Sequence, residues 1–82
     1  MGLTKEQLEN YGFSSIGDNF TFSKRVHERI FLEYDTCDGF VTIVRFLEIP
    51  KHNTDRVKII FPHKIDTESK LKSLTDIFTG NF

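Results

Sequence analysis

The side chains that most often carry catalysis are few in this chain, and their spacing does not group them. Cys37 is the single cysteine, and it lies beside Asp38 in a predicted hairpin turn. Nearby acid raises the pKa of a thiol, so Cys37 is expected to be a weak nucleophile. His27, His52 and His63 lie at strand ends or in loops, without the spacing of a catalytic set. The sequence therefore predicts a protein that is not an enzyme.

Acidic side chains gather near one predicted turn, where a metal ion would be conceivable. Glu33, Asp35 and Asp38 cluster there, but the segment lacks the middle ligand and the late glutamate of a calcium loop. His52 and His63 have no closely spaced second ligand that would anchor zinc. We therefore expect no metal site and no cofactor.

One local basic cluster combines cations with an aromatic ring. Lys24, Arg25 and Arg29 follow Phe22 closely. Aromatic and basic side chains on a sheet bind single-stranded nucleic acid in several folds. The chain as a whole has 11 basic and 12 acidic residues and a net charge of -1, which disfavours nucleic-acid binding. Nucleic-acid or nucleotide binding through these four residues is therefore kept as the alternative hypothesis.

Arg45 lies in the middle of an apolar stretch. If its side chain faces inward, it needs an acidic partner, because an unpaired buried charge is very costly. If it faces outward, it offers a bidentate contact to a phosphate or to a partner's carboxylate. Glu33 on the neighbouring predicted strand is the structural partner that we favour.

Two helices frame the chain. Thr4 and Gln7 form a capping box for a helix over 4–11, and Gly12 is placed to end that helix. Asp66 or Thr67 is expected to begin the second helix, and Gly80 to end it. Its apolar stripe consists of Leu71, Leu74, Ile77 and Phe78.

Between the helices, apolar and polar residues alternate with a period of two. This pattern predicts four strands, over 20–23, 28–35, 40–49 and 56–61, with a turn at 14–19. The predicted fold is a single α+β domain over residues 1–82. It has a short N-terminal helix, a four-stranded antiparallel meander and a C-terminal helix packed on the sheet.

The predicted sheet has more apolar side chains than one layer of helices can cover. The face opposite the helices would carry Phe31, Phe40, Val44, Phe46 and Ile60. Exposed apolar clusters of this kind normally mark a partner surface. The other interpretation is that one helix covers each face.

Composition limits the remaining classes. Nine of the 82 residues are Phe, and there is no Trp. No apolar run approaches the roughly 20 residues of a membrane span, so we expect no membrane association. A single cysteine in so small a chain fits a reducing cytoplasm better than secretion.

The two ends of the chain resemble small phage and mobile-element proteins. The likeness rests on the opening helix, which runs from Leu3 to a Gly-Phe pair at Gly12 and Phe13, and on a closing helix from Leu71 to Gly80. The resemblance implies a non-enzymatic inhibitor of a host protein in a bacterial cytoplasm, as anti-CRISPR proteins are, or a transcription modulator.

Three hypotheses follow from the sequence. The leading one is a phage-type binding protein that inhibits a host protein, such as a CRISPR–Cas or other defence component, through Phe31, Phe40, Phe46 and Arg45. The alternatives are the nucleic-acid module described above and a homo-oligomeric structural protein, whose apolar face would bury itself against a second copy as a homodimer.

Overall fold

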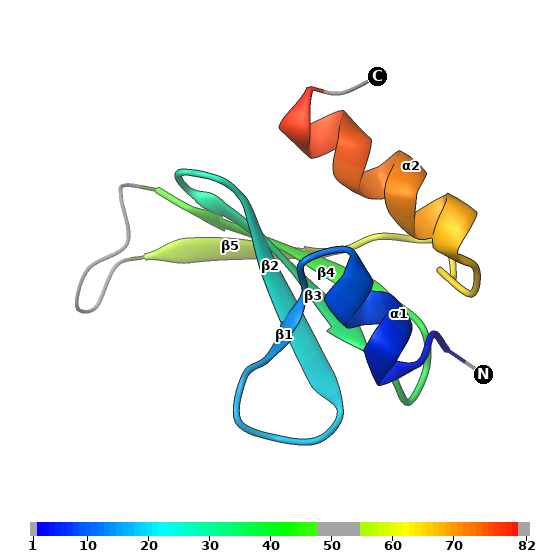
Figure 1. Cartoon of the computed structure of the whole chain (residues 1–82). Helices are drawn as coiled ribbons and strands as arrows, with labels where there is room; N and C mark the ends of the chain where they lie inside the picture. Colours follow the sequence, from blue (N-terminus) through cyan, green and yellow to red (C-terminus); the bar gives the residue numbers. More distant parts are fainter. Residues whose placement is uncertain (1, 48–54, 81–82) are drawn as a thin grey trace.

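The computed structural model describes residues 2–47 and 55–80, which form one antiparallel sheet and two helices (Figure 1). The strands lie side by side in chain order, β1-β2-β3-β4-β5, and each pair is antiparallel. The elements are α1 (Lys5–Asn10), β1 (Ser14–Ser15), β2 (Thr21–His27), β3 (Ile30–Asp35), β4 (Val41–Phe46), β5 (Arg56–Ile60) and α2 (Glu68–Thr79). The predicted α+β class and antiparallel order are confirmed.

The sheet has one strand more than the sequence predicted. Ser14 and Ser15 were expected in a turn, but they form the short edge strand β1 and pair with Ser23 and Phe22 of β2. Strand β2 also runs on to His27, with a bulge between Arg25 and His27. Residues 48–49, the predicted end of the third strand, lie outside the described residues.

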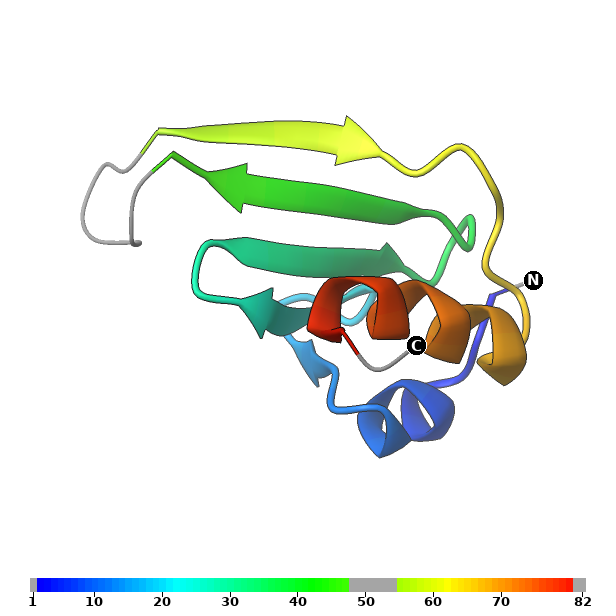
Figure 2. The same cartoon turned by 90° about the horizontal axis from the view of Figure 1, so that it is seen from above.

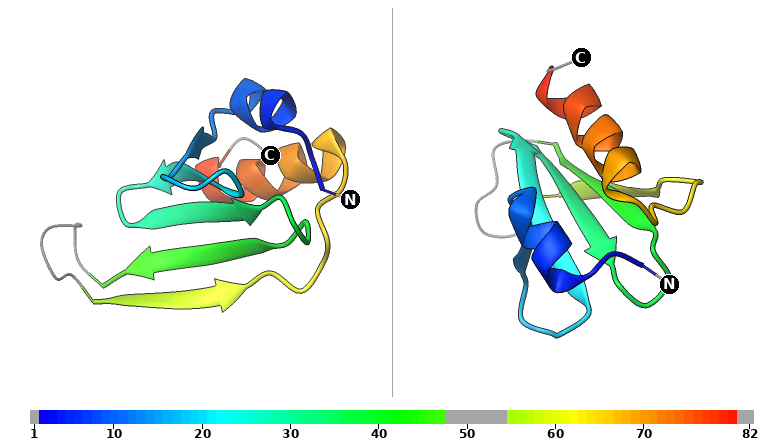
Figure 3. Two further views of the ribbon diagram at one scale, coloured as in Figure 1. Left: turned by 90° about the horizontal axis from the view of Figure 1, so that it is seen from below. Right: turned by 45° about the vertical axis from the view of Figure 1, so that its right-hand side comes forward.

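Both helices lie on the same side of the sheet (Figures 2 and 3). One buried cluster joins Leu8 of α1 and Leu71 of α2 to Leu32 and Val41, which are side chains of one sheet face. The full cluster is Leu3, Leu8, Phe13, Phe22, Leu32, Tyr34, Val41, Ile65, Leu71 and Leu74. The prediction that the helices share one face is therefore confirmed, and the interpretation with one helix on each face is wrong.

Helix α1 forms because its ends are satisfied by local side chains. The Thr4 side chain accepts a hydrogen bond from the Gln7 amide (3.2 Å), and the Gln7 side chain accepts one from the Thr4 amide (2.9 Å). Gly12 adopts φ +86°, and the Phe13 amide donates to the Leu8 carbonyl. A helix this short is unstable alone, so burial of Leu8 against the sheet must hold it.

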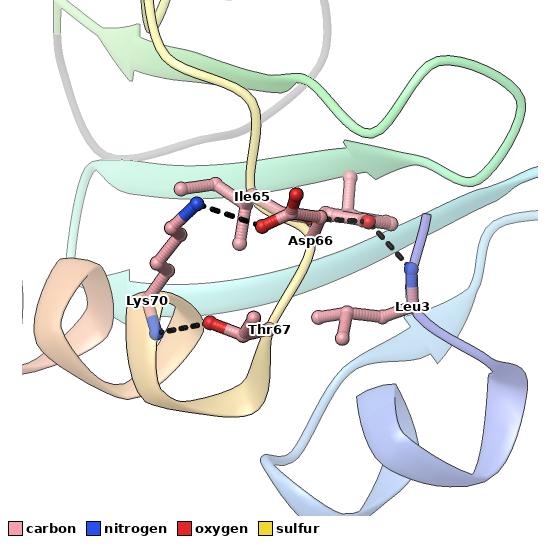
Figure 4. Close-up of polar contacts among 6 residues, drawn as sticks. Leu3, Ile65, Asp66, Thr67 and Lys70 are labelled. Carbon is pink, nitrogen blue, oxygen red and sulfur yellow. Dashed lines mark hydrogen bonds and ion pairs between the residues drawn. The ribbon is translucent and has the colours of Figure 1, made fainter. Parts of the chain in front are cut away.

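Helix α2 begins at Thr67, whose side chain accepts a hydrogen bond from the Lys70 amide (Figure 4). It ends at Gly80 in the left-handed conformation, as the sequence predicts. The expected apolar stripe is only partly buried: Leu71 and Leu74 are in the core, whereas Ile77 is 59% exposed. Ile77 instead lines a groove that is described below.

Tyr34 ties both ends of the chain to the sheet. Its hydroxyl accepts a hydrogen bond from the Leu3 amide (2.7 Å) and donates one to the Ile65 carbonyl (2.6 Å). Leu3 and Ile65 lie just ahead of α1 and α2, and Figure 4 shows the two segments side by side. One buried hydroxyl therefore fixes where each helix approaches the sheet.

Candidate binding surface on the open sheet face

Side chains of the second sheet face point away from both helices, because side chains alternate along a strand. Register pairs place them together in rows across the strands, such as Arg25, Phe31, Val44 and Lys58. We call this surface the open face. Its strand residues are Thr21, Ser23, Arg25, Phe31, Glu33, Asp35, Thr42, Val44, Phe46, Arg56, Lys58 and Ile60.

Two phenylalanines form the centre of one end of the open face. The Phe31 and Phe46 rings meet edge to face, with centroids 5.5 Å apart. The Arg25 guanidinium lies 5.8 Å from the centre of the Phe31 ring, and that of Arg56 lies 5.8 Å from the centre of the Phe46 ring. Such cation–π contacts are each worth about 0.5–1 kcal/mol at an exposed site. Each ring is thus held in place by a cation.

A hollow of about 240 Å³ lies beside these rings. Val44 is among the residues that line it, and this side chain is only 2% exposed although no helix covers it. Lys58 and Arg56 line the hollow from β5, and Glu33 lines it from β3. We call Arg25, Phe31, Phe46, Arg56 and Lys58 the cationic half of the open face. A partner that presents an apolar side chain next to a carboxylate would be complementary to this half.

The other end of the open face has the opposite charge. A hollow of about 400 Å³ is lined there by Asp35, Asp38, Phe40, Thr42 and Ile60. The carboxylates accept hydrogen bonds from the amides of the turn: Asp35 from Cys37 (2.7 Å) and Asp38 from Phe40 (2.9 Å). We call Asp35, Asp38, Phe40 and Ile60 the acidic half. The β3–β4 turn therefore fixes two negative charges beside the half-buried Phe40 and the exposed Ile60.

The structure brings three of the four predicted partner-binding residues to the open face. Phe31 and Phe46 are in contact, and Phe40 lies at the opposite end, in the acidic half. Arg45 does not belong with them, because it alternates with Val44 and Phe46 and so points to the helix side of the sheet.

The pairing of Arg45 with Glu33 is therefore wrong. Arg45 lies opposite Ile30 and Val57, whereas Glu33 lies opposite Thr42 on the other face. Arg45 is also exposed, so water solvates its charge and no acidic partner is required.

The four residues of the predicted nucleic-acid cluster are dispersed. Phe22 is in the core, 3% exposed, and the Lys24 ammonium donates to the Tyr11 carbonyl on the helix side (2.7 Å). Arg29 lies in the β2–β3 turn and donates to the Leu47 carbonyl (3.0 Å). Phe22 and Lys24 thus lie on the helix side and Arg25 on the open face, so the prediction that the four residues form one site is wrong.

Arg56 and Lys58 complete the cationic half and were missing from the predicted sites. The sequence signal for them was the period-two alternation in β5. It places Arg56 and Lys58 on one face of the strand and Val57 and Ile59 on the other. Their position next to Phe46 and Val44 follows only from the β4–β5 register. Alternation within one strand does not set the register between two strands, so the sequence could not place these cations beside the rings.

The residues that suggested chemistry remain apart. Cys37 is exposed at the turn, and loss of hydration together with the adjacent Asp35 raises the pKa of its thiol. His27 is at the end of β2 and His63 follows β5, while His52 lies outside the described residues. Among residues 2–47 and 55–80, no three His, Cys, Asp or Glu side chains group so that they could hold a metal ion.

A second groove lies on the helix side, where α2 leaves β5 uncovered. It measures about 400 Å³, and its walls include Phe61, Ile65, Leu74 and Ile77. Val57 and Ile59 on the same side of β5 are 47% and 60% exposed. The helix stripe is too narrow to cover five strands, so the outermost strand remains open.

None of the described helices has the length and apolar character needed to cross a bilayer. Comparison of the chain with models of protein families, with curated proteins and with solved structures finds no match.

Proposed function

We propose that this protein is a non-enzymatic binding module whose open face docks onto another folded protein. The observation that carries the proposal is the Phe31–Phe46 pair, which is held in contact on a face that neither helix covers. Aromatic anchors beside arginine are the side chains that dominate binding energy in protein interfaces. Phe31, Phe46, Arg25 and Arg56 have this composition.

The charges of the open face favour a protein over a nucleic acid as its occupant. Arg25, Arg56 and Lys58 would attract phosphates, but Asp35 and Asp38 at the other end of the same face would repel them. A protein surface can present carboxylates to the cationic half and basic side chains to the acidic half. Its charge pattern would be complementary to both ends.

For the identity of the partner, we expect a host-defence protein in a bacterial cytoplasm, and we expect binding to inhibit that protein. This expectation comes from the likeness of the two chain ends to small phage proteins, and from the single cysteine. We keep it as the biological setting of the proposed binding.

The test is affinity capture from host cells, with and without phage infection, using three forms of the protein. The first is the native chain and the second is F31S/F46S. The matched control is I59S/I77S, which removes two apolar side chains that are 60% and 59% exposed on the helix side. We expect the native chain and the control to retain the same protein, and F31S/F46S to lose it.

Circular dichroism and thermal unfolding establish that each form is folded. Equal capture by folded F31S/F46S, or loss of capture by I59S/I77S alone, would contradict the assignment to the open face. A parallel titration with fluorescent poly(U) tests the nucleic-acid alternative. Binding that weakens steeply with salt and disappears in R56E/K58E would favour that alternative.

A further inference from the structure

Charge on the open face is ordered along the strand direction. Arg25 and Lys58 lie in one row across the sheet, and Arg56 lies in the next row beyond it. Glu33 lies one row back in the other direction, and Asp35 one row further. The face therefore changes from positive to negative within a few residues of each strand.

A surface with this order is complementary to itself. Consider a two-fold axis that lies between two stacked open faces and runs across the strands, between the Glu33 row and the Phe31 row. Rotation about this axis reverses the order of the rows, so the cationic half of each copy meets the acidic half of the other. Closed two-fold contacts of this isologous kind are the commonest assembly of soluble proteins.

We propose that the open face pairs with the open face of a second copy of this chain, in a two-fold sheet-on-sheet dimer. The proposal rests on the proposed function in one respect, that the open face is a protein-binding surface, and it names one occupant of that surface. A foreign partner would compete with the second copy for the same residues.

Individual contacts follow from the register. The reversed rows place Phe46 of one copy over Phe40 of the other, because Phe46 is the last residue of β4 and Phe40 directly precedes that strand at the opposite end of the face. They also bring Glu33 next to Arg25 of the second copy, one strand away. Stacked sheets pack about 10 Å apart, a spacing that side chains of this size fill. Apolar burial and opposite charge therefore act together in this arrangement.

Pairing along the β5 edge is a less favourable way to join two copies. An antiparallel β5–β5 contact would bring Arg56 and Lys58 of both copies together along one line, and like charges on neighbouring strands are destabilising. Lysine on an edge strand is also a common protection against edge pairing. The charges of this chain thus favour stacking of faces over joining of edges.

The test is sedimentation equilibrium of the native chain and of charge-swapped forms, from micromolar to millimolar concentration. R56E/K58E makes the cationic half acidic. E33K/D35N makes the other end less acidic, and the amide introduced by D35N keeps an oxygen acceptor for the turn. We expect the native chain to dimerise and each variant alone to dimerise at least about tenfold more weakly, and an equal mixture of the two to form a heterodimer.

The matched control is K5E/R45E, which changes the net charge as much as R56E/K58E but acts at exposed positions off the open face. It should dimerise like the native chain. The dimer should also weaken in high salt, because its charged pairs are screened.

Two results would overturn the proposal. One is a native chain that stays monomeric at millimolar concentration. The other is a dimer that survives R56E/K58E and F31S/F46S but is lost in I59K, which would place the contact at β5. A monomer that still captures a host protein through Phe31 and Phe46 would refute only the self-pairing. A dimer without host capture would refute only the foreign partner.

Discussion

At the scale of single residues, Tyr34 shows how one polar group can organise this small domain. It is fully buried, and its hydroxyl joins the segments ahead of both helices. Removal of the hydroxyl leaves the Leu3 amide and the Ile65 carbonyl buried without that partner. Such orphaned groups are expensive because the water that they lost on folding is not replaced.

Y34F is therefore expected to lower the free energy of unfolding by about 1–3 kcal/mol. Urea unfolding followed by circular dichroism measures this change. Y11F is the control, since the Tyr11 hydroxyl has no hydrogen bond to any other described residue. If Y34F lowers the free energy of unfolding no more than Y11F does, the two hydrogen bonds of the Tyr34 hydroxyl make no net contribution to stability.

Tyr34 also predicts a loss of stability in alkali. Burial, the largest cause, raises the pKa of its hydroxyl above the ordinary value of about 10. The folded state then holds this proton more tightly than the unfolded chain. The stability it contributes is complete below pH of about 10 and is lost as the pH rises toward the folded pKa.

Comparison of unfolding free energies from neutral pH to about pH 11 checks this expectation. The native chain should lose more stability over that interval than Y34F, which has no phenol to ionise at this site. Identical slopes would show that Tyr34 ionises as easily in the folded state as in the unfolded chain.

At the scale of elements, the cap at Thr67 decides where α2 begins. Its side chain satisfies the Lys70 amide, and Asp66 just ahead of it forms an ion pair with the Lys70 ammonium (2.8 Å; Figure 4). T67A should cost about 1 kcal/mol of stability, and T67S should cost little, because serine caps equally well. Thermal unfolding of the two variants measures the difference, and equal loss in both would point to a role of the Thr67 methyl group instead.

Strands also differ in how much they contribute to stability. Leu32 of β3 is fully buried beneath the helices, whereas Ile59 of β5 is 60% exposed. L32A should cost about 2–5 kcal/mol, and I59A less than about 1 kcal/mol. Denaturant unfolding tests this contrast. A large loss of unfolding free energy in I59A would show that α2 covers β5 more fully than the exposure of Ile59 implies.

At the scale of the whole molecule, the sheet has one covered and one open face, and its long edge is β5. The Phe61 amide donates to the Val41 carbonyl and the Leu47 amide to the Asp55 carbonyl. Hydrogen bonds alternate along an antiparallel pair, so the amides of Arg56, Lys58 and Ile60 point away from β4. Within residues 2–47 and 55–80, these amides form the free edge of the sheet.

Hydrogen exchange can therefore report how the molecule assembles. In a face-to-face dimer, the amides of Arg56, Lys58 and Ile60 should exchange quickly at every protein concentration, while Leu32 exchanges slowly. If protection of the three β5 amides rises with concentration, the second copy has added its strand at the edge instead.

Local helix and strand signals are what the sequence determined by itself. Thr4 and Gln7 cap α1, Gly12 and Gly80 adopt positive φ, and alternation placed Phe31 and Phe46 on one face. These features depend on neighbours within a few residues, so a short stretch of sequence is enough to predict them. The order of the elements predicted that both helices pack on one face, whereas the count of apolar side chains also allowed one helix on each face.

Tertiary structure alone decided the register between neighbouring strands and which strands α2 covers. Pairing of Arg45 with Ile30 directed its charge away from Glu33, and β4–β5 pairing brought Arg56 to the Phe46 ring. A shift of one residue in either pairing would reverse these outcomes, because side chains alternate between faces. Strand pairing joins residues that are distant in the chain, and the free energy of pairing depends on all of these residues together. The charge order of the open face is therefore a property of the folded sheet.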